Sequence, residues 1–310
     1  MTAMAEPGSA GSLRGTSARR RNEGLIRIVL LGASILSILI SAAIVLTLIF
    51  EAITFLTQID LSQLVAPGWF PRRGMFSIST VVVGTLIITI IAMLIATPIG
   101  LASAIYLSEY SSPKTRKTVK PILEILAGIP SVVLGFWALT WISPNVVQSI
   151  WPSASGFSLM AAGIGVGILT IPLIASISED AMRAVPVSLR EASYGLGAKR
   201  VTTSLRVVFP AAISGIVAAL ILAASRAVGE TMVVAIAAGA SGGSLFTTDP
   251  LGPGQTLTGA MAALATGSDQ VTGNSAAFQS LFFLGLLLFI ATLGLNVIGD
   301  AFVRRTRQTY

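Results

Sequence analysis

The 310-residue sequence contains no cysteine and no histidine. A chain without cysteine has no disulfide, thiolate metal site or thiol nucleophile. A chain without histidine lacks the side chain most often used for acid–base catalysis near neutral pH and for metal ligation. Charge is also scarce, because only 11% of the residues are Asp, Glu, Lys or Arg, against about 25% in a typical soluble domain. These absences disfavour an enzyme, and we expect no catalytic residue, metal or other cofactor in this chain.

Sequences that bind nucleotides are missing as well. No G-x-x-x-x-G-K-[ST] phosphate-binding loop occurs, and in the glycine-rich stretch "GLGAKR" at Gly195–Arg200 the lysine has the wrong spacing for one. No polar segment is long enough to form a nucleotide-binding or solute-capturing domain. If the chain is part of a pump, ATP and Mg are therefore expected on a partner subunit, and solute capture on another.

Apolar residues make up 54% of the sequence and gather in long runs. A helix that crosses a bilayer needs about 20 mostly apolar residues. The sequence therefore predicts an all-α polytopic membrane protein. Its six transmembrane helices are predicted at Leu25–Phe50, Ile78–Leu107, Ile122–Ile142, Phe157–Ile177, Ala211–Ala238 and Phe278–Phe302.

The segments between these runs alternate in charge. Of the 20 basic residues, 17 fall on one predicted side, two (Arg72 and Arg73) on the other, and one (Arg226) within a run. Cytoplasmic loops of membrane proteins are enriched in Lys and Arg, so both termini are predicted to be cytoplasmic. Residues 1–24 are predicted to form a disordered basic tail, and residues 25–57 the first transmembrane helix. The formal charge of +7 follows from this topology and does not indicate a nucleic-acid partner.

The longest predicted cytoplasmic connection is Ser178–Pro210, which is longer than a simple linker needs to be. Pro186 followed by "VSLREASYGLG" predicts a short helix that ends at Gly195 or Gly197. The sequence "AKRVTTSLRVVF" predicts a second, basic amphipathic helix that leads back into the membrane. Two short helices across a glycine turn form a compact knob, which can fit a groove on a partner protein.

This connection resembles a cytoplasmic motif of the inner-membrane subunits of ABC importers. The motif reads E-A-A, three residues, G, nine residues and I-x-L-P. The same spacing occurs here with Glu191, Ala192, Ser193, Gly197, Val207, Val208, Phe209 and Pro210. Ser193, Val207 and Phe209 are mild departures from the motif. The resemblance implies that Glu191, Ala192, Gly197, Val207, Phe209 and Pro210 belong to a loop that couples the chain to an ATPase. It also implies a type-1 (MetI-like) permease core over residues 76–303, with the coupling loop at 178–210.

Four further stretches, "IYLSEYS", "LAGIPSVVLGFWAL", "EASYGLGA" and "SRAVGETMVV", resemble the pair of permeases of bacterial phosphate importers. The form "RAVGETM" is more similar to the PstC-type permease than to the PstA-type. The resemblance implies a bacterial plasma (inner) membrane protein that provides half of a path for inorganic phosphate. The implied partners are a PstA-type permease, a dimer of PstB-type ATPase subunits, an extracytoplasmic PstS-type phosphate-binding protein and the lipid bilayer.

Arg226 and Glu230 lie inside a predicted span, and charges at such depth usually face a bundle interior or a water-filled path. Their spacing of four residues predicts one helix face. Two interpretations stay open: the two charges neutralise each other and hold two helices in register, or they line the path of the anion. Arginine offers a planar fork of donors suited to phosphate oxygens, and a carboxylate accepts the protons that phosphate still carries. In the family resembled, the matching positions are proposed for the pathway, and Ser225 and Thr231 could add hydroxyl contacts.

Other features leave alternatives open. The fifth connection, Ala240–Ala277, could hold a short interfacial helix at Thr256–Gly267 and could dock a binding protein. Lys120 and Glu124 are predicted to pair, and Glu109 is expected to contact the cytoplasmic loops. The same architecture could carry sulfate, molybdate or an organic solute. A stand-alone channel leaves the coupling loop without a purpose, and an intramembrane enzyme is disfavoured by the missing His, Cys and carboxylate clusters.

Overall fold

A computed structural model describes residues 17–239, 242–267 and 275–306. The chain divides into two compact units, Met1–Phe50 and Glu51–Tyr310. The described part of the first unit belongs to one helix, α1 (Ser17–Gln58), which continues into the second unit. This helix begins at Ser17 and not at Leu25, because alanine, arginine and glutamate in "ARRRNE" favour helix. Residues 1–16 of the predicted tail lie outside the described residues.

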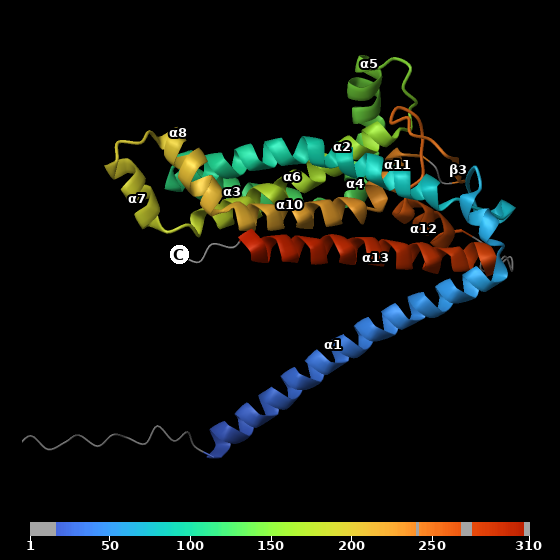
Figure 1. The fold of residues 1–310 in the computed structure, drawn as a ribbon, viewed down its shortest axis with the longest axis horizontal. Helices are drawn as coiled ribbons and strands as arrows, with labels where there is room; N and C mark the ends of the chain where they lie inside the picture. Colours follow the sequence, from blue (N-terminus) through green and yellow to red (C-terminus); the bar gives the residue numbers. More distant parts are fainter. Residues whose placement is uncertain (1–16, 240–241, 268–274, 307–310) are drawn as a thin grey trace, which may run out of the picture. The chain divides into compact units, whose positions relative to one another are not determined.

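Almost all elements of the second unit are helices (Figure 1). Up to the middle of the chain they are η1 (Leu61–Val65), β1 (Gly68–Phe70), η2 (Pro71–Arg73), β2 (Met75–Phe76), α2 (Ile78–Ile105), η3 (Tyr106–Tyr110), α3 (Pro113–Ala127), α4 (Ser131–Trp137), η4 (Ala138–Val147), α5 (Gln148–Ile150) and α6 (Leu159–Arg183). After α6 they are α7 (Val187–Gly195), α8 (Arg200–Thr203), η5 (Ser204–Val208), α9 (Phe209–Ala211), α10 (Ile213–Val228), α11 (Met232–Ala237), β3 (Ser244–Leu245), α12 (Leu257–Ala265) and α13 (Ser275–Thr306).

The described residues contain four straight helices long and apolar enough to cross a membrane, or up to six spans if each of two bent helix pairs is one span. The straight ones are Gly24–Gln58, Ile78–Tyr110, Leu159–Arg183 and Ala276–Arg305. The bent pairs are Pro113–Ala127 with Ser131–Ile150, at 85°, and Arg200–Ala211 with Ile213–Val228, at 70°. The count of six agrees with the sequence when each bent pair is taken as one span.

Two of the predicted spans are wrong as continuous helices. The predicted Ile122–Ile142 breaks between α3 and α4, because Pro130 disfavours a helical conformation at the residue before it. The predicted span Ala211–Ala238 is also broken, because α10 ends at Val228 and Gly229 follows it. Polypeptide that is not helical at membrane depth is tolerated only where protein covers it or where it lines a cavity.

Close packing of α2 against α6 forms the centre of the second unit, and α10 packs against both of these helices and against α13. Gly163 in α6 faces Ile91, where an added Cβ would lie only 2.7 Å from the nearest side-chain atom. Small residues let helices in a membrane approach closely, and Gly163 begins the glycine-rich stretch "GIGVG" at Gly163–Gly167. A buried apolar cluster around Ile88, Ala92 and Val166 extends from this contact to α4 and α11.

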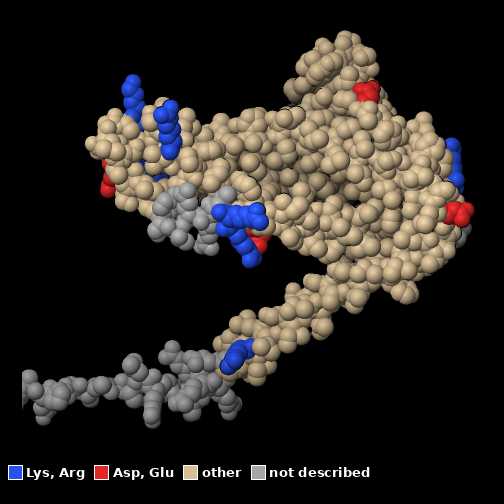
Figure 2. Space-filling model, in the orientation of Figure 1, with Lys and Arg blue, Asp and Glu red and all other residues tan. Residues whose placement is uncertain are grey.

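The two ends of the second unit carry different structures. Figure 1 shows α7 and α8 at one end and the small sheet with α12 at the other. The sheet has the order β2-β1-β3 with antiparallel pairs, and Trp69 at its centre is 1% exposed. Helix α12 lies within the predicted Thr256–Gly267, but it packs against α13, α11 and α2 with half of its residues buried. Figure 2 shows a broad belt without Lys or Arg side chains between the ends, and basic side chains toward the α7 end.

Gly84 in α2 is expected to be a sensitive position for stability. A Cβ at Gly84 would overlap the backbone carbonyl oxygen of Gln255, which precedes α12. Gly84→Ala should therefore destabilise the folded chain by about 1–3 kcal/mol, as other overpacked sites do. The matched control is Gly294→Ala in α13, where nothing lies within 4 Å of the added atom. Thermal unfolding of the two purified variants in detergent tests the difference, and equal midpoints would contradict the expectation.

Candidate functional site

The α7 end is a helical knob, as the glycine spacing predicts. Helix α7 ends near Gly195, and Gly197 adopts φ +79°, a left-handed conformation that glycine accepts without strain. The hydroxyl groups of Ser193 and Thr203 are hydrogen-bonded at 2.8 Å and tie α7 to α8. The serine that departs from the E-A-A pattern therefore holds the two short helices of the knob together.

The coupling-motif residues divide into two groups. Glu191, Ala192 and Gly197 are exposed on the knob, next to Leu196, whose side chain is 89% exposed. Phe209 instead packs against a buried cluster formed by Ala104, Met182, Val185, Val208, Ala212 and Ile216. Val207 is half-buried and Pro210 is exposed. The first group is available to a partner, while Phe209 anchors the returning chain to the bundle.

Arg190 attaches the knob to the spans. Its Nη2 donates to Glu109 Oε1 at 3.0 Å and to the Met182 carbonyl at 2.8 Å, and its Nη1 donates to the Val185 carbonyl at 2.8 Å. The Glu109 side chain is only 4% exposed. The expected contact of Glu109 with the loops is confirmed, and its partner is an arginine on α7 that the sequence reasoning did not single out.

A second buried carboxylate, Glu179, joins α6 to α3. Its side chain is fully buried, accepts from Arg116 Nε at 2.6 Å and Lys120 Nζ at 2.8 Å, and lies 3.8 Å from Arg183 Nε. Lys120 also pairs with Asp180, which follows Glu179 on α6. The predicted pairing of Lys120 with Glu124 is wrong, because the buried carboxylate on α6 offers Lys120 a less hydrated partner than an exposed residue of its own helix.

Arg226 lies in the last turn of α10 and is exposed in this chain. Within the described ranges its guanidinium has no hydrogen bond or ion pair. The last turn of a helix carries a partial negative charge, which stabilises a cation there. The neighbours Ala227 and Val228 are buried, so Arg226 is held by a packed helix end while its fork of donors stays accessible.

Glu230 does not continue the helix of Arg226. Its Oε1 accepts from the backbone N–H groups of Met232 and Val233, at 3.2 and 3.3 Å, and so caps the start of α11. Its backbone carbonyl accepts from Thr258 Oγ1 at 2.7 Å. The prediction that Arg226 and Glu230 share a helix face is wrong, because α10 ends at Val228. No ion pair within 4 Å joins these two described residues, so mutual neutralisation lacks the contact it requires.

The two flanking hydroxyl groups are already engaged. Ser225 Oγ donates to Asn296 Oδ1 of α13 at 3.2 Å, and Thr231 Oγ1 donates to the Gly229 carbonyl at 3.3 Å. Ser225 therefore fixes α10 against α13, and Thr231 stabilises the break. Of the four residues predicted for the pathway, Arg226 is the one whose side chain makes no hydrogen bond or ion pair within the described residues, and Glu230 keeps its second carboxylate oxygen, Oε2, without a hydrogen bond there.

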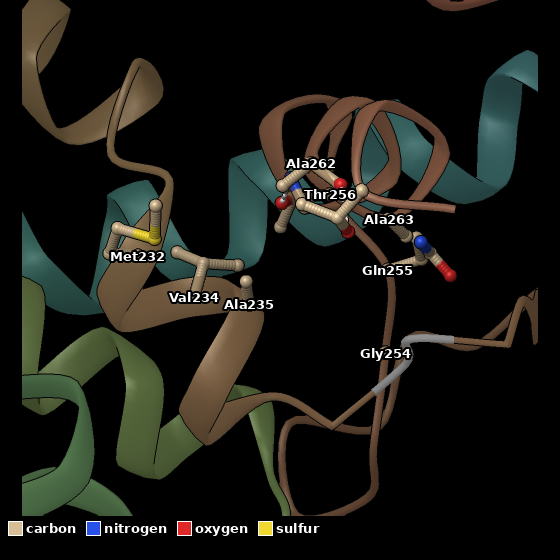
Figure 3. A pocket seen from close by; sticks show the side chains of 10 residues that line it. Met232, Val234, Ala235, Gly254, Gln255, Thr256, Ala262 and Ala263 are labelled. Atoms are coloured by element: carbon tan, nitrogen blue, oxygen red, sulfur yellow. Dashed lines mark hydrogen bonds between the residues drawn. The ribbon is translucent and has the colours of Figure 1, made fainter. Parts of the chain in front are cut away.

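A cavity of about 230 Å³ begins beside this break (Figure 3). Its lining runs from Met232, Val234 and Ala235 of α11 to Gly254–Thr256 and the α12 residues Gly259, Ala262 and Ala263, with Thr266 after them. Figure 3 shows Met232 and Val234 on one side and Thr256 with Ala263 across from them. The lining is mostly apolar. Among the described residues no group of three or more acidic side chains is arranged to hold a metal ion.

Comparison with known proteins assigns the chain to a family. Residues 96–308 match the family of binding-protein-dependent transport system inner membrane components. The chain belongs to this family. The matched range contains both the knob and the broken helix at Arg226.

Individual relatives cover most of the chain. It is 34% identical over 240 residues to the probable ABC transporter permease protein YqgH of Bacillus subtilis, with 77% of this chain and 73% of that protein aligned. It is 31% identical over 259 residues to the phosphate transport system permease protein PstC 1 of Mycobacterium tuberculosis, with 77% and 75% aligned. Among solved structures, a bacterial ABC transporter that imports the acidic polysaccharide alginate has a TM-score of 0.63 at 16% identity, covering 93% of this chain and 100% of that chain.

The family assignment gives the fold and the kinds of partner. The likeness to the alginate transporter shows that the second unit has the fold of an ABC importer permease. An importer permease of this binding-protein-dependent family acts with a separate ATPase and a substrate-binding protein. The chain is thus a multi-pass membrane subunit of a larger transporter.

Proposed function

We propose that this chain is the PstC-type permease of an ATP-driven importer of inorganic phosphate and forms half of its translocation path. The observation that carries the proposal is the accessible guanidinium of Arg226 at a broken membrane helix, in a chain 31% identical to a phosphate permease. Arginine binds phosphate oxygens in a bidentate way. Discontinuous helices are where transporters commonly bind their substrates.

The charge bias of the loops supports the orientation within this proposal. With the knob and both termini in the cytoplasm of a bacterium, 17 of the 20 basic residues lie on the cytoplasmic side of the inner membrane. The small sheet and α12 then face outward. A PstA-type permease completes the path, two PstB-type subunits bind ATP and Mg below it, and a PstS-type protein delivers phosphate from outside. This chain itself binds no cofactor and catalyses no reaction.

The knob provides the mechanical link in this mechanism. Exposed apolar side chains on it, Val187, Tyr194 and Leu196, suit a groove on an ATPase subunit. Closure of the ATPase dimer on ATP moves the knob, and the Arg190–Glu109 contact passes this movement to the end of the α2 span. The spans then rock and expose the Arg226 region to the two sides of the membrane in turn.

Uptake of labelled phosphate tests the proposed function. Cells that lack their own phosphate importers and express this chain with its partner subunits are expected to accumulate phosphate, and to stop when ATP is depleted. Excess sulfate or molybdate should leave the uptake unchanged. Competition by either anion would favour the alternative substrate, and uptake without a copurifying ATPase would favour a channel.

A further inference from the structure

The carbonyl oxygen of Glu230 lies at the break between α10 and α11 and is held by a side chain of another helix. Helix α10 ends at Val228 and α11 begins at Met232, so Glu230 belongs to neither helix. Within the described residues no backbone N–H donates to this carbonyl, which accepts instead from Thr258 Oγ1 at 2.7 Å. A carbonyl at a break in a membrane helix needs such a partner, because the hydrocarbon core of a bilayer offers no water in its place.

Thr258 lies in the first turn of α12, and the start of this helix is attached to the centre of the bundle. The residue is 3% exposed. The N–H of its neighbour Leu257 donates to Thr85 Oγ1 of α2 at 3.0 Å. Thr256 Oγ1 lies 3.3 Å from Thr258 Oγ1 and can donate to it, which leaves the proton of Thr258 for the Glu230 carbonyl. The Thr258 hydroxyl is therefore presented to the break from a fixed position.

Packing alone does not hold the break on the side of α12. The cavity of about 230 Å³ lies between Met232 and Val234 of α11 and the start of α12, and Figure 3 shows Thr256 across it from these two side chains. Side chains that line a cavity lack the contacts that would oppose a shift. The Thr258–Glu230 hydrogen bond therefore sets the spacing between α12 and the break.

Glu230 connects Thr258 to both sides of the break. Its N–H donates to the Ala227 carbonyl in the last turn of α10 at 3.3 Å, and its Oε1 caps α11. Arg226 belongs to the same last turn of α10. A change in the position of Glu230 therefore changes the direction in which α10 presents the Arg226 side chain.

We propose that Thr258 is a positioning residue of the translocation path, which fixes the break so that Arg226 meets the anion in one orientation. This proposal rests on the proposed function, because Thr258 acts through the guanidinium that is proposed to bind phosphate. A bidentate contact between arginine and phosphate depends on the orientation of the guanidinium plane. Thr258 controls this orientation and makes no contact with the anion itself.

Thr258→Val and Thr258→Ser test the hydrogen bond. Valine has nearly the shape of threonine but no hydroxyl, so Thr258→Val leaves the Glu230 carbonyl without its donor, whereas Thr258→Ser retains the donor. Thr258→Val should lower the initial rate of labelled phosphate uptake per assembled importer about tenfold, as expected for one lost hydrogen bond to a buried group, and Thr258→Ser should retain at least about half of the rate. The matched control is Thr140→Val, which should transport normally, because the exposed Thr140 hydroxyl donates only to the Phe136 carbonyl of its own segment.

A double substitution separates positioning from a purely structural role. If Thr258 acts through Arg226, adding Thr258→Val to Arg226→Gln should lower uptake no further than Arg226→Gln alone, because residues that act as one unit are not additive. A purely structural role would lower uptake by the same factor in both backgrounds. That result would overturn the proposal, and so would normal uptake in Thr258→Val.

Two further comparisons keep the outcomes distinct. Thr258→Ala also removes the hydroxyl and takes less room, so it replaces Thr258→Val in both experiments if the valine variant does not assemble. Absence of phosphate uptake by the unchanged importer would contradict the proposed function alone, and the same variants would then be compared for the solute that the importer does carry.

Discussion

Arg226→Gln is expected to reduce ATP-driven phosphate uptake by about tenfold to a hundredfold, the range given by the loss of one or two hydrogen bonds to a charged group. Glutamine keeps polarity and some length but loses the charge and the fork of donors. Arg226→Lys keeps the charge and should retain a larger part of the uptake, because lysine remains a point charge without bidentate geometry. Initial rates of labelled phosphate uptake, with equal amounts of assembled transporter, measure both effects.

Neighbouring substitutions separate a role in the pathway from a role in structure. Ser225→Ala removes only the bond to Asn296 and should change uptake little. Glu230→Gln keeps an oxygen that can cap α11, so it should be milder than Glu230→Leu, which removes the cap. If both Arg226→Gln and Arg226→Lys transport normally, Arg226 does not contact the anion.

The broken helices show which parts of this fold the sequence predicts and which it does not. Long apolar runs predict α2, α6 and α13 well, because a bilayer requires about 20 apolar residues of any span. The same rule predicted one continuous helix in place of α3 and α4, and another in place of α10 and α11, because it counts apolar residues and does not consider where the chain turns. Pro130 and Gly229 mark both breaks, but proline and glycine also occur within continuous spans, as Pro98 and Pro172 do.

The buried carboxylates show a second limit of what can be predicted from the sequence. Glu109 and Arg190 are 81 residues apart, and Glu179 and Arg116 are 63 apart. A helical spacing rule reaches only three or four residues, which is why it paired Lys120 with Glu124. The low charge content of the sequence was a separate indication that these carboxylates have distant partners. A carboxylate near a membrane boundary is rarely buried without a cation from another element. The knob itself was predictable, since its glycine turn and its length are local features.

Arg190→Met is expected to detach the knob from the spans and reduce phosphate uptake at least about tenfold. The substitution leaves Glu109 as a buried charge without its cation, which costs about 3–5 kcal/mol in comparable pairs. It also frees the Met182 and Val185 carbonyls at the end of α6. Less ATPase should therefore copurify with the permease, and thermal unfolding in detergent should occur at a lower temperature.

A double substitution decides whether the buried charge causes this loss. Glu109→Gln combined with Arg190→Met removes both charges, so it should be more stable than Arg190→Met alone, although the knob remains unattached and uptake stays low. The control is Arg304→Met. The Arg304 and Asp300 side chains are paired at 2.6 Å but both are exposed, and exposed ion pairs contribute little to stability. Full uptake in Arg190→Met with normal ATPase binding would mean that movement of the knob reaches the spans through α8, η5 and α9, where Phe209 of α9 packs on the bundle, and not through Arg190.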